Sequence, residues 1–271
     1  KDKKSIGYAL FYRAKLCIDP ETAIRAGTKD QRKDQIRSDL KNSLENWDIT
    51  DAHYMIGLQY LEELNVFSDS PAGEGRNSDV CRKEAYRHLS IAAERGYRDA
   101  WLYLQLANLA EEYHELRKAV RFLSYVVEEE ESYAEQISRI GSWYHTLYQD
   151  TGAEEYADEA IRYFDLSDDS YGLKHATFHG RGMIYFKRRQ YEKAIEQFEG
   201  LLELLKTEAD EEYRLHYQGI SYQMIGQAYQ EMGKFADAIS SYEKAYEYFD
   251  RIGQSDRLQS ISEKLKMIGG T

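Results

Sequence analysis

Proline and cysteine are the residue types that this sequence nearly lacks. Its 271 residues include only Pro20 and Pro71, and only Cys17 and Cys81. Because proline breaks a helix in its interior, so few prolines are compatible with an almost wholly helical chain. Two distant cysteines make no disulfide framework, so we interpret them as unpaired thiols in a reducing, cytoplasmic compartment.

Long apolar runs are missing as well. No segment approaches the ~18 apolar residues of a membrane-spanning helix, and the N-terminus does not have the order of regions that marks a signal peptide. We therefore expect no membrane span. The chain begins with Lys1 and not with methionine, so we expect that it was processed or trimmed, which makes the missing targeting segment weak evidence.

Acidic residues outnumber basic ones, and their distribution is uneven. The formal net charge is -12. Residues 1–45 hold eleven Lys or Arg and seven Asp or Glu, a charge of +4, which leaves -16 for the remainder. So acidic a body repels phosphate backbones, and we expect no nucleic-acid partner. We interpret the basic N-terminal segment as a solvated helix face; a contact with an anionic partner is the alternative.

No catalytic or cofactor-binding pattern is evident. The Gly-Arg-Gly run at 180–182 lacks the strand and the spacing of a phosphate loop. His175 and His179 lie one helical turn apart, a spacing that suits a metal, but no HExxH glutamate lies between them and no third ligand is near in sequence. Glu128–Glu131 is interpreted as a solvated helix end. We expect no catalytic residue, no metal and no cofactor.

Helical hairpins are what the sequence does contain. Residues 222–249 read YQMIGQAYQEMGKFADAISSYEKAYEYF. Gly226 lies on an apolar helical face, where glycine costs about 1 kcal/mol relative to alanine, so we predict that it admits a second helix closely. Gly233 is the predicted end of the first helix. The second helix continues the pattern with Ala238, Tyr242 and Ala245.

This order of aromatic, glycine and alanine positions resembles the tetratricopeptide repeat. Weaker copies carry the glycine or its replacement at Gly182, Gly141 and Gln105, with later rings or leucines at Phe198, Phe164 and Leu123. Residues 92–100, AAERGYRDA, resemble the Sel-like variant of the repeat. The spacing is irregular: we predict longer helices between Gly182 and Gly226, and a longer turn at 149–156.

The resemblance implies an all-α, right-handed superhelical solenoid of stacked antiparallel hairpins, in which each repeat contacts only its neighbours. We expect four segments: an N-terminal helical cap or degenerate repeat at 1–46, a Sel-like repeat at 47–100 with a long loop at 66–79, tetratricopeptide-like repeats at 101–252, and a C-terminal capping helix at 253–271.

In this family the first helix of each repeat lines the concave groove, and the resemblance implies a binding surface there. The residues that flank the core positions are Tyr54, Leu58, Leu102, Leu106, Ser138, Ser142, His145, His179, Met183, Lys187, Gln223, Gln227 and Gln230. The amides suit a peptide backbone, and the apolar upstream part suits an amphipathic helix or a hydrophobic peptide. The lysine and asparagine clamp of the chaperone-binding members is not visible.

The leading hypothesis is a non-enzymatic scaffold that binds a protein or peptide in this groove, alone or within a larger assembly. One alternative is a peptide-gated receptor of the Rap-like kind, with the basic N-terminal helices as its output surface. Another is the interaction region of a larger effector or enzyme. We expect no enzyme within these residues, because solenoid grooves seldom supply the water-excluded pocket that catalysis needs.

Overall fold

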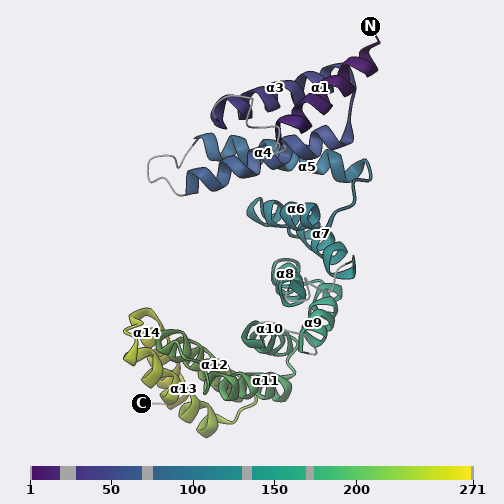
Figure 1. Cartoon of the computed structure of the whole chain (residues 1–271). Coiled ribbons are helices and arrows are strands. Elements are labelled where there is room, and N and C mark those ends of the chain that lie inside the picture. Colours follow the sequence, from purple (N-terminus) through teal and green to yellow (C-terminus); the bar gives the residue numbers. More distant parts are fainter. Residues whose placement is uncertain (1, 19–28, 69–75, 130–135, 169–173, 270–271) are drawn as a thin grey trace. The chain divides into compact units, whose positions relative to one another are not determined.

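The computed structural model describes residues 2–18, 29–68, 76–129, 136–168 and 174–269 (Figure 1). These residues form thirteen helices and no strand. They divide into two compact units, unit 1 at residues 1–126 and unit 2 at residues 127–271. No described helix is long and apolar enough to span a membrane.

Unit 1 is a run of paired helices. Its elements are α1 (Lys3–Ile18), α3 (Lys29–Asn46), α4 (Thr50–Ser68), α5 (Arg76–Glu94), α6 (Ala100–Glu112) and α7 (Leu116–Glu129), the last of which ends just past the boundary. Helix α1 packs against α3, and α4 packs against α5. Helices α6 and α7 meet through the ring of Tyr103, whose centroid lies 4.2 Å from that of Tyr125.

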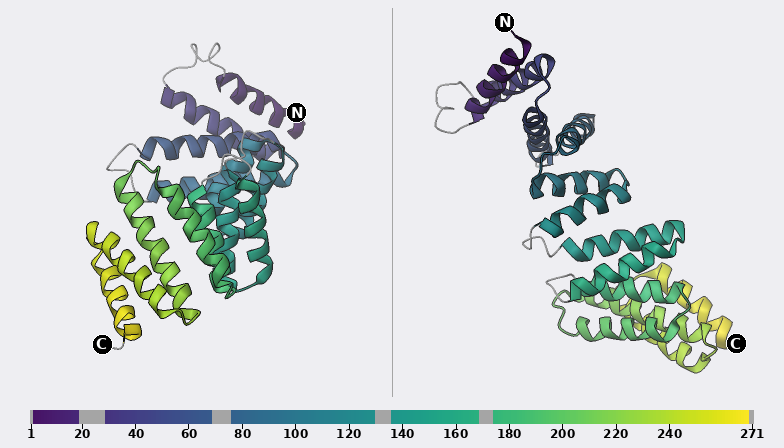
Figure 2. Two further views of the ribbon diagram at one scale, coloured as in Figure 1. Left: turned by 90° about the horizontal axis from the view of Figure 1, so that it is seen from below. Right: turned by 90° about the vertical axis from the view of Figure 1, so that its right-hand side faces the viewer.

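Unit 2 repeats the helix pair three times and adds one helix. Its elements are α8 (Ile137–Thr151), α9 (Glu154–Asp168), α10 (Lys174–Lys187), α11 (Tyr191–Leu205), α12 (Glu211–Glu231), α13 (Phe235–Arg251) and α14 (Ser255–Gly269). The pairs are α8 with α9, α10 with α11, and α12 with α13, and each pair packs on the next (Figures 1 and 2). The predicted all-α solenoid of stacked helix hairpins is confirmed.

The loops of the chain are shorter than predicted at two places. The turn predicted at 149–156 is mostly helical, because α8 continues to Thr151 and α9 begins at Glu154. Gly152, with a φ of 70°, supplies the left-handed residue that ends α8. Of the loop predicted at 66–79, residues 66–68 and 76–79 are helical, and 69–75 lie outside the described residues.

Glycines form notches that receive large side chains from the partner helix. A Cβ added to Gly226 would lie 2.9 Å from the Tyr242 ring, and one added to Gly182 would lie 2.8 Å from the Phe198 ring. Gly57 faces Leu89 in the same way. Real Cβ atoms do not approach other atoms so closely, so no larger residue fits without a shift. The predicted packing role of these glycines is confirmed.

Helix α12 carries two such notches. Gly219 faces the Phe249 ring and Gly226 faces the Tyr242 ring. The two glycines are seven residues apart on α12, and the two rings are seven residues apart on α13. Seven residues are about two turns, so both contacts belong to one antiparallel register of α12 and α13. The 21 residues of α12 confirm the longer helix predicted in this part of the chain.

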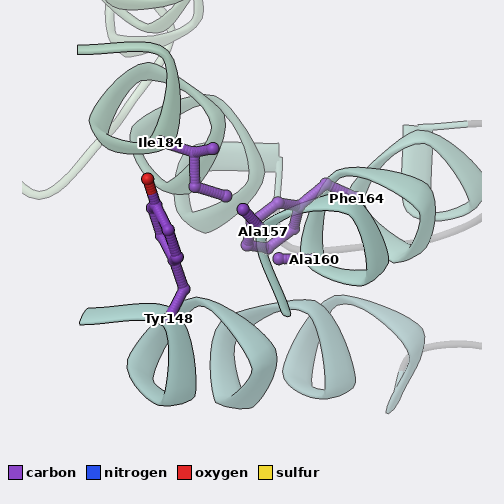
Figure 3. Close-up of a cluster of buried hydrophobic side chains, with 5 residues drawn as sticks. All are labelled: Tyr148, Ala157, Ala160, Phe164 and Ile184. Carbon is purple, nitrogen blue, oxygen red and sulfur yellow. The ribbon is translucent and has the colours of Figure 1, made fainter. Parts of the chain in front are cut away.

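Phe164 joins three helices of unit 2. From α9 its ring reaches Gly141 of α8 and Gly180 of α10, where added Cβ atoms would lie 2.6 Å and 2.5 Å away. Figure 3 shows the ring beside Ala157 and Ala160, with Tyr148 and Ile184 converging on the same cluster. Because one fully buried ring holds both a hairpin and its neighbour, this cluster fixes the stacking of two repeats.

The first and last described elements are the helices α1 and α14. Helix α14 packs against α13, and its buried Ile261 joins the cluster around Tyr242 and Phe249. This is the contact that a C-terminal capping helix must make. Both prolines and Glu130–Glu131 lie outside the described residues. Cys81 is a buried free thiol.

We expect Gly226→Leu to lower the free energy of unfolding by about 2 kcal/mol. Overpacking against Tyr242 costs about 3 kcal/mol, and removing a helical glycine returns about 1 kcal/mol. Denaturant unfolding followed by circular dichroism measures the difference. Ala236→Leu, at an exposed position of α13, is the control and should leave stability nearly unchanged. Equal stability of the two variants would show that the notch is not a contact point.

Candidate functional site

The first helices of the three hairpins in unit 2 form a continuous surface, which we call the first-helix wall. It is the face of α8, α10 and α12 that carries His145, His179 and Tyr217. Helix α8 packs on α10. Helix α10 meets α12 through rings: the centroids of His179 and Tyr217 are 6.4 Å apart, and those of His175 and Tyr213 are 5.5 Å apart. The histidine pair predicted to lie on a surface or groove therefore faces two tyrosines.

The histidines of the wall are uncharged at neutral pH. Burial, with smaller contributions from His179 and Lys187, lowers the pKa of His145 to about 4. Burial also lowers the pKa of His179. Both imidazoles therefore remain neutral hydrogen-bonding groups, and His145 already bonds to the Gln149 amide at an N–N distance of 3.1 Å.

Three predicted groove residues thus come together: His145, His179 and Lys187. The prediction for Lys187 needs a correction, however. Its ammonium donates a hydrogen bond to the Tyr148 carbonyl at 3.0 Å and lies 4.2 Å from the Tyr148 ring centroid. A lysine at a helix C-terminus satisfies its last carbonyls and complements the helix dipole. Lys187 therefore caps α8.

The predicted glutamines of α12 differ in their contacts. The Gln230 carbonyl accepts a hydrogen bond from the Tyr242 hydroxyl at 2.8 Å, so this amide faces the core partner helix. The Gln223 carbonyl accepts a longer one, 3.4 Å, from Arg257 of α14. Gln227 is half-buried, and Met183 packs against the cluster that includes Phe198. For Gln223 and Gln227 the assignment to the binding surface stays a prediction.

Three other predicted residues are core residues. Leu102 and Leu106 are fully buried in α6, and Ser138 is 2% exposed. Their positions face a neighbouring helix, which the helical spacing alone did not distinguish from the flanking face. Ser142 is half-buried and donates to the Ser138 carbonyl.

The predicted residues of unit 1 that keep some exposure are Tyr54 and Leu58. Both are half-buried. The Tyr54 ring stacks on Tyr97 with centroids 4.3 Å apart, and burial raises the Tyr54 pKa to about 12.

A cavity that the sequence analysis missed lies between the second helices of unit 2. We call it the second-helix groove: α11 and α13 form its walls, α12 forms its floor, and its volume is about 680 Å³. The repeat pattern implies a binding surface on the first helices, whereas the walls of this groove are second helices. The signal that would have found it is a repeated spacing, since Glu199 precedes Lys206 and Asp237 precedes Lys244 by seven residues on the two walls.

The charge of the chain is concentrated in unit 2. Residues 127–271 hold 16 Lys or Arg and 28 Asp or Glu, a charge of -12, so residues 1–126 are neutral in sum. Residues 215–230 of α12 contain no charged side chain. An uncharged stretch of helix in so acidic a unit provides surfaces for contacts that do not depend on ion pairs.

Unit 1 contains a buried histidine pair. The Nδ1 atoms of His53 and His88 are 2.8 Å apart, His53 Nε2 is 3.1 Å from Asp48, and His88 Nε2 is 2.8 Å from Arg87. These partners form one consistent chain only when both rings are neutral: Arg87 donates to His88, His88 to His53, and His53 to Asp48. No group of three or more potential metal ligands occurs among the described residues.

Comparisons with known proteins bear on the fold. Residues 173–251 match the tetratricopeptide repeat family model. A MamA protein structure is 16% identical, covers 74% of this chain and 95% of its own, and superposes with a TM-score of 0.54. The C-terminal part of a TPR repeat-containing protein from Cytophaga hutchinsonii is 13% identical, covers 96% of each chain and has a TM-score of 0.50. No curated protein matches the chain.

Together these findings identify residues 173–251 as tetratricopeptide repeats and the fold of the chain as a solenoid of that type. The solved structures share so few identical residues with this chain that they show the fold alone. A fold of this type supports a role as a protein-interaction scaffold in general. The resemblance of residues 92–100 to the Sel-like variant stays a prediction.

Acidification should destabilise the protein through the His53–His88 pair. Burial lowers the pKa of both rings, that of His88 to about 4, whereas an unfolded histidine titrates near 6.5. The neutral pair therefore stabilises the fold above pH 6.5. As the pH falls from 6.5 to 4, the contribution of His88 alone to the free energy of unfolding decreases by about 3 kcal/mol. Denaturant unfolding at several pH values measures this slope.

A His53→Gln/His88→Gln variant is the comparison for that slope, because it keeps the carboxylates that also respond to acid. We expect its stability to fall less than that of the wild type between pH 6.5 and 4. Identical slopes would contradict a neutral histidine pair.

We expect Lys187→Met to raise the pKa of His145. The charge of Lys187 is one of the causes that lower it, while burial, the larger cause, remains. The pKa should therefore stay below its usual value. An NMR titration of the His145 ring measures the shift. Lys193→Met, on the exposed side of α11, removes a like charge and should leave His145 unchanged. If the His145 pKa is the same in both variants, the charge of Lys187 does not affect His145.

Proposed function

We propose that this protein is a non-enzymatic scaffold that binds a segment of a protein partner on the first-helix wall of unit 2. Its fold, stacked helix hairpins, presents the exposed faces of successive helices as one extended surface. On this wall those faces carry rings and amides, which bind side chains and peptide groups of a partner without reacting with them.

The observation that supports the proposal is the neutrality of the wall within an acidic unit. The pKa of His145 and that of His179 are lowered, so neither ring is charged at pH 7. Tyr213 and Tyr217 supply aromatic surface beside them, with their centroids 4.5 Å apart. Gln227 adds an amide that both donates and accepts hydrogen bonds.

These groups favour an uncharged ligand segment. Rings contact apolar and aromatic side chains, and amides pair with peptide groups along an extended or helical segment. A charged segment would gain nothing from neutral rings and would lose hydration on contact. The partner segment is therefore apolar and hydrogen-bonding, and its affinity depends little on salt.

Selection of peptides from a displayed random library on the wild-type protein tests the proposal. The selected peptides should be poor in charged residues, and raising NaCl from about 0.1 M to about 1 M should change their affinity little. Gln223→Glu/Gln227→Glu should weaken their binding by about tenfold, because each new carboxylate loses water to an uncharged ligand.

Gln190→Glu is the matched control: it makes the same chemical change at an exposed position of unit 2 away from the wall and should leave affinity unchanged. Peptides that bind the wall variant and the wild type equally, or that are selected for charge, would show that the wall is not the binding surface.

A further inference from the structure

The second-helix groove lies on a different face of α12 from the first-helix wall. Its floor is the face of α12 that carries Gln218, Tyr222, Ile225 and Tyr229, and none of its lining residues belongs to the wall. Ser240 and Ser241 lie between Asp237 and Lys244 on the α13 side of the groove, so small residues keep that wall low there.

Each wall of the groove carries an acid and a lysine in the same order. On one wall Glu199 lies on α11 and Lys206 is its C-cap, and on the other wall Asp237 and Lys244 lie on α13. The two members of each pair are seven positions apart in the sequence. Seven residues of helix rise about 10.5 Å. Helix α12 runs antiparallel to both walls, so α11 and α13 run the same way. One end of the groove therefore has two carboxylates, and the other end has two ammonium groups.

The carboxylates meet at Tyr229. All three residues line the same groove. Burial raises the pKa of the Tyr229 hydroxyl, and the negative charges of Glu199 and Asp237 contribute to the rise. Among the described residues, neither carboxylate forms an ion pair or a side-chain hydrogen bond. Lys234 adds one positive charge at this end, with its Nζ 5.9 Å from the Tyr229 ring centroid, so one negative charge remains uncompensated.

The lysine end is likewise only partly compensated. Lys206 pairs with the exposed Glu203 at 2.7 Å. The Lys244 ammonium lies 5.0 Å from the Tyr222 ring centroid, and the Tyr222 ring in turn stacks on Tyr248 with centroids 5.7 Å apart. The positive charge of Lys244 therefore lies above aromatic surface and, among the described residues, has no acidic partner in the groove. The groove is therefore dipolar, and a ligand with the opposite order of charges relieves both ends at once.

We propose that the second-helix groove binds an extended peptide segment that presents Lys or Arg to Glu199 and Asp237, and Asp or Glu to Lys206 and Lys244. In extended chain, residues three apart are separated by about 10 Å, which matches the spacing of the two ends. Two turns of a docked helix would fill roughly 800–1,200 Å³, more than the groove holds. The segment lies over Tyr222, and its peptide groups reach Gln218 and Ser240.

Capped tetrapeptide probes test this inference on the free protein. The dipolar probe is acetyl-Arg-Ala-Ala-Glu-amide, and the comparison probes are acetyl-Arg-Ala-Ala-Arg-amide, acetyl-Glu-Ala-Ala-Glu-amide and acetyl-Gln-Ala-Ala-Gln-amide. NMR titration should show saturable shifts of the Ser240 and Lys244 amides with the dipolar probe, and at least about fivefold weaker binding of the other three.

A pair of variants separates the groove from the general charge of the unit. Glu199→Gln/Asp237→Asn should weaken the dipolar probe by about tenfold, the ratio that two surface ion pairs of ordinary strength give. Glu196→Gln/Glu243→Gln changes the net charge equally at exposed positions of the same helices outside the groove and should leave the affinity as it is.

Several outcomes would overturn the inference. The first three are an absence of saturable shifts, tighter binding of either like-charged probe, and an equal loss of affinity in both variants. The fourth is a change in the groove signals when the protein concentration is raised without a probe, which would make a second copy of the chain the occupant. The probes contain no aromatic or large apolar residue, so a failure of the first-helix wall leaves these results unaffected.

Discussion

The fold of this protein depends on close contact between glycine on one helix and a large side chain on the next. Every hairpin of unit 2 contains such a contact, with Gly141, Gly182 and Gly226 facing Phe164, Phe198 and Tyr242. A helix pays about 1 kcal/mol for an internal glycine, and a buried ring recovers more than that by close packing. Because Phe164 also enters the notch of Gly180 on the following repeat, the same contact that closes a hairpin stacks it on its neighbour.

This packing decides what remains for binding. The rings of α9, α11 and α13 fill the notches. One face of each first helix, α8, α10 and α12, is therefore buried in the core, and the other face remains half-exposed. On that remaining face burial keeps His145 and His179 neutral. The proposed recognition of an uncharged segment thus follows from the stacking itself, because the helices that hold the core also desolvate the groups beside it.

Helix α12 illustrates how one element serves several surfaces. Gly219 and Gly226 face α13, Tyr222 with Tyr229 forms part of the floor of the second-helix groove, and Gln223 and Gln227 belong to the proposed first-helix wall. The absence of charge from residues 215–230 is consistent with this position, since a charged side chain on any of these faces would have to be partly buried. The charges that surround it come from α11 and α13.

By itself the sequence determined the all-α class, the hairpin pattern, the glycine notches and the long α12, because each of these is local or depends on helical periodicity. It also predicted His145 and His179 as groove residues, and the structure brings these two histidines near each other. Tertiary structure alone decided that Leu102, Leu106 and Ser138 are buried, that Lys187 caps α8 and that Gln230 bonds to Tyr242. It alone brought Glu199 and Asp237 to one phenol. The reason is physical: periodicity fixes which residues share a face, whereas burial and pairing depend on which neighbouring helix covers that face.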